Sequence, residues 1–95
     1  MKLLYAKRFS KDINAIQNDA EIKKNLLELI DKIKRIESLA ELNGVRKMEG
    51  YPKYYRIKIG EYRLGVKLET TELKLIRFLH RKDIYRRFPL IELTA

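Results

Sequence analysis

The chain has 95 residues, 45% of them hydrophobic and 37% charged, which suits one small folded domain over residues 1–95 rather than a disordered chain. Its net charge of +9 indicates an anionic partner, such as nucleic acid, an anionic membrane or an acidic protein. The lack of cysteine excludes disulfides and thiolate chemistry, and a single histidine without clustered carboxylates argues against a metal site, so we expect no cofactor.

The positive charge is concentrated in the second half of the chain. Residues 1–44 hold nine Lys and Arg against seven Asp and Glu, a net +2, whereas residues 45–95 hold thirteen against six, a net +7. The apolar run near the N-terminus, Leu-Leu-Tyr-Ala, is far shorter than a signal-peptide core or a membrane span. We therefore expect a cytoplasmic protein with no membrane partner.

A short strand and two helices are expected in the first 36 residues. Residues 2–6 form the strand, and Ser10 can be the N-cap or a first-turn residue of a helix with Phe9, Ile13 and Ile16 on its apolar side. Asp19 is expected to cap a second, longer helix. The apolar stripe of that helix should face the core and consists of Ile22, Leu26, Leu29, Ile30, Ile33 and Ile36.

A β-hairpin over residues 54–68 follows. Two runs of alternating apolar and polar residues meet at Gly60 and Glu61, and a glycine at the first central position suits a type II′ turn, which needs a positive φ there. This turn fixes the register and pairs Ile59 with Tyr62. The remaining facing pairs are Lys58 with Arg63, Ile57 with Leu64, Arg56 with Gly65, Tyr55 with Val66 and Tyr54 with Lys67.

The predicted register gives the hairpin an apolar face and a cationic face. Lys58 directly opposite Arg63 adds nothing to folding, because like charges that face each other across a ladder repel. A polyanion favours such a pair, since arginine grips phosphate with two parallel hydrogen bonds and lysine adds a point charge. A face that is merely solvated is the structural alternative. The cationic face carries Tyr54, Arg56, Lys58, Arg63 and Lys67, with Gly65 as a gap among them.

The last third of the chain completes the sheet. A strand over residues 73–79 has Leu73, Leu75 and Leu79 on one face and Ile76 and Phe78 on the other, which places it at the sheet centre. Residues 82–88 are expected to form one helical turn, and the residues after Pro89 to dock on the core or fray. The order β-α-α-β-β-β predicts an α+β fold, with two N-terminal helices packed on a small, mainly antiparallel sheet and a short C-terminal turn or helix. The first strand should join this sheet as an edge or through a crossover.

His80, Arg81 and Tyr85 come just after the central strand, where chemistry is often carried on a rigid scaffold. Cations, an imidazole and a phenol suit ribonucleolytic transesterification: the 2′-oxygen loses a proton, the phosphorane is neutralised, and the 5′-oxygen gains a proton as it leaves. An imidazole titrates close to neutral pH and can serve as base or acid. The structural alternatives are a packing or phosphate-contacting role for His80 and packing or base stacking for Tyr85.

The run Tyr-Arg-Ile-Lys-Ile-Gly-Glu-Tyr-Arg-Leu, followed by a strand that ends in His-Arg-Lys-Asp-Ile-Tyr, resembles the RelE/ParE superfamily of type II toxin-antitoxin toxins. The likeness includes the two-helix opening and the Met48-Glu49-Gly50 approach to the hairpin. For the RelE branch it implies an mRNA endonuclease that acts in the ribosomal A site without a metal. It also implies a cognate antitoxin, an acidic segment that wraps and neutralises the toxin in a hetero-oligomer.

The resemblance also assigns roles to residues of the cationic face. The two basic hairpin positions of the family fall on Arg56 and Lys58, and the first is Arg where the RelE type has Lys, which matters because a guanidinium is a poor base. His80 can take over proton transfer. The expected catalytic residues are Lys58, Arg63, His80, Arg81 and Tyr85, and the expected RNA-binding residues are Tyr54, Arg56 and Lys67.

Two other functions are compatible with the same pattern. The ParE branch shares the fold and poisons DNA gyrase, so the fold alone does not choose between the targets. A non-catalytic RNA-binding protein descended from a toxin would keep the cationic face and show no cleavage on translating ribosomes. The combination of the cations with His80 and Tyr85 favours the ribosome-dependent endonuclease, because gyrase poisoning has no evident need for these groups.

Overall fold

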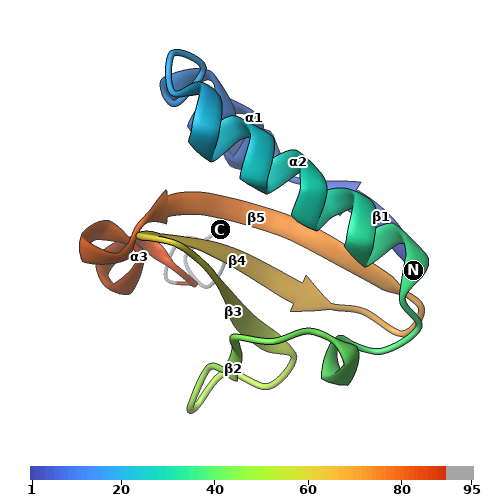
Figure 1. Cartoon of the computed structure of the whole chain (residues 1–95). Helices are drawn as coiled ribbons and strands as arrows, with labels where there is room; N and C mark the ends of the chain where they lie inside the picture. Colours follow the sequence, from blue (N-terminus) through green and yellow to red (C-terminus); the bar gives the residue numbers. More distant parts are fainter. Residues whose placement is uncertain (90–95) are drawn as a thin grey trace.

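The computed structural model describes residues 1–89, which form a five-stranded sheet with two long helices on one face and a short helix at one end (Figure 1). The strand order is β1-β5-β4-β3-β2, with β1 parallel to β5 and all other neighbours antiparallel. The predicted α+β fold is confirmed. The elements are β1 (Lys2–Tyr5), α1 (Lys7–Ala15), α2 (Ala20–Arg35), the 3-10 turn η1 (Leu39–Glu41), β2 (Val45–Lys47), β3 (Tyr54–Ile59), β4 (Tyr62–Leu68), β5 (Glu72–His80) and α3 (Arg81–Arg87).

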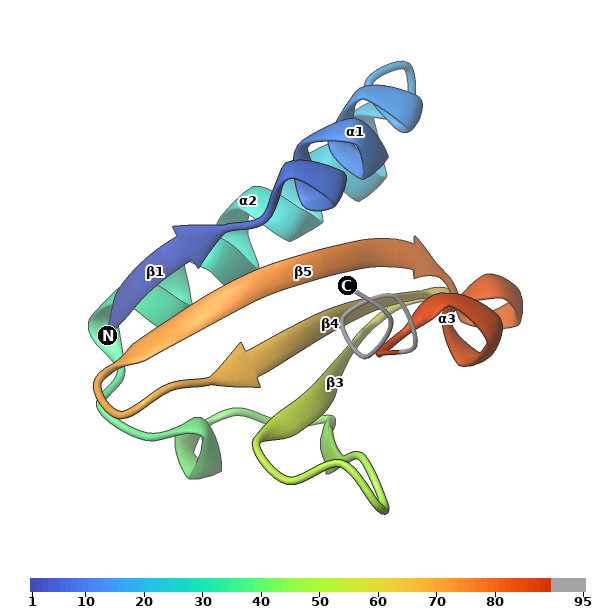
Figure 2. The ribbon, with the colours of Figure 1, turned by 180° about the vertical axis from the view of Figure 1, so that it is seen from behind.

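The two ends of the sheet differ from what the sequence predicts in one respect. The first strand lies at an edge and is reached by a crossover through α1 and α2, as expected. The strand β2 at the other edge was not predicted, because it is only three residues long. Seen from behind in Figure 2, β1 and β5 run side by side, and α1 and α2 lie above the sheet. No helix within residues 1–89 is long and apolar enough to cross a membrane.

The long helices bury the stripes that their sequence predicts. The Oδ1 atom of Asp19 accepts a hydrogen bond from the Ile22 backbone N–H at 3.1 Å, so the predicted cap of α2 is confirmed. Helix α1 begins at Lys7 after Ala6, without a side-chain cap, so Ser10 is a first-turn residue, the second of the two expected places, and not the N-cap. The buried side chains of these helices that join the main core are Phe9, Leu26, Ile30 and Ile33.

The β3-β4 hairpin has the predicted register at all six pairs. Its turn has a positive φ of 59° at Gly60 and no positive φ at Glu61, as the expected turn type requires. The facing residues Ile57 and Leu64 are 1% and 0% exposed and lie in the main core with α1 and α2. The apolar face of the hairpin therefore packs against the helices and leaves the cationic residues on the other side.

We expect Leu64→Ala to lower the free energy of unfolding by about 2 to 5 kcal/mol, the usual cost of emptying a fully buried leucine site. Urea denaturation measures this through the transition midpoint. Leu27→Ala is the matched control, because Leu27 on α2 is 56% exposed and should change stability by within about 0.5 kcal/mol. A Leu64→Ala protein as stable as the control would contradict the packing of this face.

A β-bulge in β5 overturns part of the predicted alternation. Gly65 pairs with Arg77 and Val66 pairs with Leu75, so Ile76 has no residue opposite it. Because of this extra residue, every later side chain of β5 lies on the face of the sheet opposite to the one that strict alternation predicts. Phe78 consequently joins Leu73 and Leu75 in the main core, and Leu79 lies with Ile76 on the other face, contrary to the strict alternation expected from the sequence.

A buried ion pair closes the edge of β5 where β1 ends. The last pair of the β1-β5 ladder is Tyr5 with Leu75, and beyond it α1 takes the place of a strand. The Oδ2 atom of Asp12 accepts hydrogen bonds from Phe78 N at 2.9 Å and from Arg77 Nε at 2.8 Å, and Oδ1 accepts from Arg77 Nη2 at 3.1 Å. Asp12 and Arg77 are 9% and 5% exposed, so both charges are compensated inside the protein.

Helix α3 covers part of the sheet face opposite to α1 and α2. Its Ile84 and the following Phe88 form a second, smaller core with Tyr54 and Ile76. The ring of Phe88 lies on the backbone of Gly65, where an added Cβ would meet ring atoms at 2.8 Å, so the predicted gap among the cations is filled. The C-terminal helix α3 has seven residues and is longer than the expected single turn. The expected docking or fraying of the chain after Pro89 concerns residues 90–95, which lie outside the described part.

Candidate nucleic-acid interface

Two adjoining hollows on the cationic side of the hairpin hold most of its positive side chains. The first has a volume of about 460 Å³ and the second about 310 Å³, and Arg63 and Tyr85 line both of them. We call the two together the cationic groove. It is lined by Gly44, Val45, Arg46, Arg56, Lys58, Arg63, Arg81, Lys82 and Tyr85.

Other hollows are larger but chemically less suited to an anion. One of about 510 Å³ follows residues 47–52, and one of about 600 Å³ on α2 is lined by charges of both signs. The cationic groove is distinguished by six positive side chains and, within residues 1–89, by the absence of any Asp or Glu from its lining. Among the described residues, no three His, Cys, Asp or Glu side chains gather as a metal site.

Arg63 is held in the groove by the turn of the hairpin. Its Nη1 atom donates hydrogen bonds to the carbonyl oxygens of Gly60 at 3.0 Å and of Tyr62 at 2.9 Å. Lys58 lies directly opposite on β3 and is exposed. The pair that the sequence singles out therefore stands side by side at the groove, with one guanidinium already oriented by the backbone.

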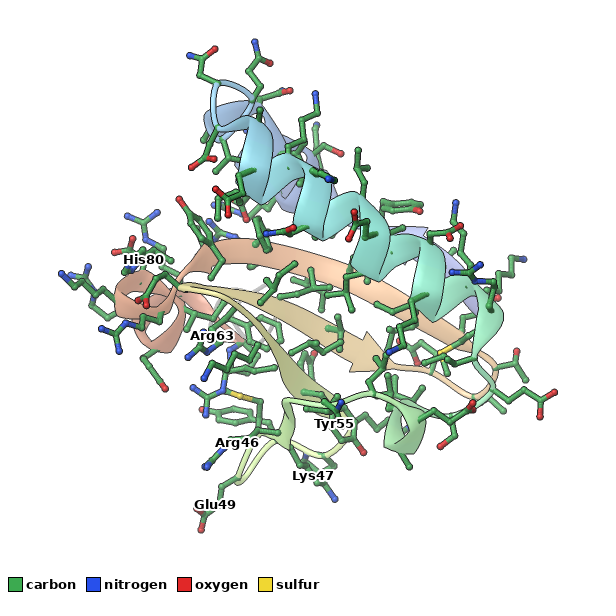
Figure 3. The ribbon with its side chains drawn as sticks, in the orientation of Figure 1. Arg46, Lys47, Glu49, Tyr55, Arg63 and His80 are labelled. Carbon is green, nitrogen blue, oxygen red and sulfur yellow. The ribbon has the colours of Figure 1, made fainter. Side chains whose placement is uncertain are left out.

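Arg46 is a groove residue that sequence reasoning missed. It lies on β2 directly opposite Arg56, so the ladder carries a second pair of facing like charges. Figure 3 shows Arg46 and Arg63 on the side of the sheet turned away from α1 and α2. The signal was present in the run Val45-Arg46-Lys47, because a third strand paired with the hairpin places its middle residue on the cationic face.

Arg56 and Tyr85 form a stacked pair in the groove. The Cζ atom of Arg56 lies 4.4 Å from the centre of the Tyr85 ring, a cation-π contact. The Nε and Nη1 atoms of Arg56 are buried without a hydrogen-bond partner in the described structure. A buried donor without an acceptor costs about 1 to 3 kcal/mol, more if it is charged, so this guanidinium favours a nearby anion. Tyr85 itself is 65% exposed and leaves ring surface open to a ligand.

Arg81 enters the groove from the first position of α3. Its backbone N–H donates to the carbonyl oxygen of Glu61 at 2.8 Å, and its Nε atom lies 2.7 Å from Glu61 Oε2. The hairpin turn and the start of α3 are therefore joined by a backbone bond and an ion pair. This connection places Arg81 beside Arg63 and Tyr85 in the smaller hollow.

His80 does not line the groove. It pairs with Tyr62 on β4, which belongs to the helix-bearing face, and the two rings meet edge to face at 5.6 Å between centroids. The Nδ1 atom of His80 accepts a hydrogen bond from Lys82 N at 3.2 Å and so caps α3. In Figure 3 His80 lies where β5 meets α3. Its placement fits a residue that positions Arg81 and Tyr85 through the helix.

Tyr54 and Lys67, expected to bind RNA, lie outside the groove. Tyr54 is 8% exposed and packs edge to face on Tyr51 and Phe88 in the second core. Lys67 is opposite Tyr54, with its Nζ atom 5.5 Å from that ring centre and 3.5 Å from Glu69 Oε1. The structure therefore brings together Arg56, Lys58, Arg63, Arg81 and Tyr85 and leaves the other three predicted site residues apart.

The fold thus combines a helical pair on one face of a small mixed sheet with a cationic groove on the other face. The family described as "ParE toxin of type II toxin-antitoxin system, parDE" matches residues 3–85 of this chain. The chain belongs to this family of toxins and to the RelE/ParE superfamily, which confirms the resemblance noted in the sequence.

Individual relatives agree with this placement. Toxin RelE3 of Methanocaldococcus jannaschii is 38% identical over 90 residues, which cover 94% of this chain and 100% of the relative. The RelB-RelE antitoxin-toxin complex from Methanococcus jannaschii matches with a TM-score of 0.77 and 35% identity, over 90% of this chain and 99% of that chain. The YoeB dimer from Staphylococcus aureus, at 20% identity and a TM-score of 0.69 over 85% of this chain and 97% of that chain, shares the fold.

Proposed function

We propose that this toxin is a ribosome-dependent mRNA endonuclease that inhibits translation by metal-independent cleavage. The observation that carries the proposal is the groove itself, in which cations from three strands and a helix surround an exposed tyrosine and none of the described lining residues is a carboxylate. Such an arrangement suits a phosphodiester whose negative charge grows in the transition state. The requirement for the ribosome rests on the RelE resemblance.

The proposed reaction is a transesterification within the RNA. The 2′-oxygen attacks the adjacent phosphorus and loses its proton, the bond from phosphorus to the 5′-oxygen breaks, and the leaving 5′-oxygen receives a proton. We assign Lys58, Arg63 and Arg81 to the scissile phosphate, where their donors stabilise the phosphorane. The groups in the groove that can exchange protons with the substrate are the ammonium groups of Lys58 and Lys82 and the Tyr85 hydroxyl.

The larger hollow suits the RNA backbone next to the cleaved bond. Arg46 and Arg56 lie across the ladder from each other beyond Lys58, so they are placed for a neighbouring phosphate. The open surface of the Tyr85 ring, backed by Arg56, suits the stacking of an unpaired base. His80 acts in this proposal through its cap on α3, which carries both Arg81 and Tyr85.

An antitoxin is the proposed protein partner. Two of the similar solved structures are the RelB-RelE antitoxin-toxin complex and the DinJ-YafQ toxin-antitoxin complex. A chain with a net charge of +9 is complementary to an acidic partner segment, which can neutralise the groove within a hetero-oligomer.

The test is primer-extension mapping of mRNA ends in a translation extract, with and without the protein. New 5′ ends support the proposal if they depend on translating ribosomes. They should appear equally when the protein has first been treated with a chelator and then returned to Mg²⁺-containing buffer. A gyrase inhibitor is the second candidate, because the matching family is named for ParE. Loss of DNA supercoiling by purified gyrase without any mRNA cleavage would select that function, and ribosome binding without either effect would select a non-catalytic RNA-binding protein.

Tyr85→Phe separates the two roles open to the tyrosine. Phenylalanine keeps the ring over Arg56 and removes only the hydroxyl, so stacking survives and proton exchange does not. We expect single-turnover cleavage to fall by about 10² to 10⁴-fold, the range of general acid-base catalysis, with RNA binding unchanged. Tyr85→Ala, which removes the ring as well, should weaken binding in addition. Cleavage by Tyr85→Phe at the wild-type rate would leave the ring as the functional part.

A further inference from the structure

Glu61 places a carboxylate beside the cationic groove without lining it. Its Oε2 atom lies 2.7 Å from Arg81 Nε, and its carbonyl oxygen accepts the Arg81 backbone N–H at 2.8 Å. The side chain of Glu61 is 64% exposed and that of Arg81 is 54% exposed. Exposed ion pairs of this kind contribute little to folding, so the stability of the protein does not explain a negative charge at this position.

The Glu61 carboxylate lies in the same turn that holds Arg63, the other arginine of the smaller hollow. Glu61 is the second residue of the two-residue hairpin turn, and the next residue but one is Arg63, whose guanidinium is held by Gly60 and Tyr62. One short turn therefore fixes both arginines of the smaller hollow, Arg63 through carbonyl oxygens and Arg81 through a carboxylate. A carboxylate near a phosphate site repels the ligand, so its presence needs a compensating effect.

The ordering of the Arg81 side chain by Glu61 can compensate for the repulsion between the carboxylate and a phosphate. A free arginine side chain carries about 2 kcal/mol of rotamer entropy, which is lost when it binds a phosphate. The ion pair with Glu61 fixes the guanidinium before the ligand arrives, and an arginine has donors on three nitrogens, so it can face a carboxylate and a phosphate at once. Groups that are already oriented stabilise a transition state without reorganising during the reaction.

We propose that Glu61 is a positioning residue that orients Arg81 toward the scissile phosphate. This inference rests on the proposed endonuclease function and goes beyond it by assigning a role to an acidic residue outside the lining. It predicts a separation of kinetic effects. Without the carboxylate the groove attracts RNA at least as well, yet Arg81 is less often in the reactive position, so turnover falls while binding does not.

The kinetic experiment compares Glu61→Ala with the wild type in ribosome-dependent cleavage under single-turnover conditions. We expect the maximal rate to fall by about 10-fold, within the losses of up to about 10²-fold that small misplacements cause, and the half-saturating concentration to stay equal or decrease. In an Arg81→Ala background, Glu61→Ala should cause no further loss, because the two residues act as one unit. Glu28→Ala on α2 is the control for the change in charge, since Glu28 is exposed and outside the groove.

Three results would overturn the inference. Faster cleavage by Glu61→Ala means that the carboxylate only competes with phosphate. An equal loss in the Arg81→Ala background means that Glu61 does not act through Arg81. A loss matched by Glu28→Ala means that only net charge matters.

A second measurement does not depend on cleavage. In ¹⁵N NMR of the free protein, with the Nε–H signal of Arg81 assigned by its absence in Arg81→Lys, the heteronuclear NOE should fall in Glu61→Ala and stay unchanged in Glu28→Ala. An unchanged NOE in Glu61→Ala refutes the ordering of Arg81 whatever the target of the toxin. A lowered NOE in a protein that cleaves no mRNA supports the ordering and rejects the endonuclease instead.

Discussion

Replacing Lys58 and Arg63 together by alanine should abolish cleavage and leave the fold intact. Loss of a single preorganised donor to a developing negative charge typically costs about 10² to 10³-fold in rate, so the double variant should lose more than about 10³-fold. Lys58 is exposed, and Arg63 contributes only two hydrogen bonds to carbonyl oxygens of its own turn, so little stability should be lost. Single-turnover cleavage of ribosome-bound mRNA is the measurement.

The control for this prediction removes the same charge elsewhere. Lys23 and Lys24 are exposed neighbours on α2, outside the groove, and replacing both by alanine also lowers the net charge by two. This variant should cleave close to the wild-type rate. If the Lys58 and Arg63 double variant melts early, or if the α2 double variant loses as much activity, the facing cations are structural or act only through net charge.

Asp12→Ala should destabilise the protein by about 3 to 5 kcal/mol, the cost of removing one partner of a buried ion pair. The substitution leaves the Arg77 guanidinium charged inside the protein and removes the acceptor of the Phe78 N–H. Urea denaturation with an unchanged slope and a lower midpoint is the expected result.

Two comparisons isolate the cause. Asp31→Ala breaks an ion pair with Arg35 whose side chains are 64% and 72% exposed, and it should cost no more than about 0.5 kcal/mol. Adding Arg77→Met to Asp12→Ala removes the unpaired charge and should restore part of the lost stability. If Asp12→Ala is no more destabilising than Asp31→Ala, Arg77 is solvated and the closure of the β5 edge is not energetically important.

Sequence reasoning predicted the hairpin because its signals are local. The turn at Gly60 and Glu61 sets the register through backbone geometry, and the alternation on both sides of it identifies the buried face. The α2 helix is predicted for the same reason, since Asp19 and the apolar stripe are read within one segment. The pairing of Lys58 with Arg63, and with it the centre of the groove, followed directly from the turn.

The features that were missed depend on contacts between distant segments. The Asp12-Arg77 pair joins residues 65 positions apart, and no local pattern announces it. The bulge at Ile76 has no glycine or proline on β5 itself to mark it, so the facing of Phe78 and Leu79 was assigned by simple alternation. The position of His80 follows from its pairing with Tyr62, a relation between β4 and β5 that the hairpin turn does not determine.

The contact between Phe88 and Gly65 means that the assembly of the groove and the folding of the main core depend on different contacts. Any side chain at position 65 would meet the Phe88 ring, so Phe88 at the end of α3 would have to shift. The main core lies on the opposite face of the sheet and does not include Phe88 or Ile84. A substitution at Gly65 is therefore expected to disturb the packing of Phe88, and with it the position of Tyr85, more than it disturbs the main core.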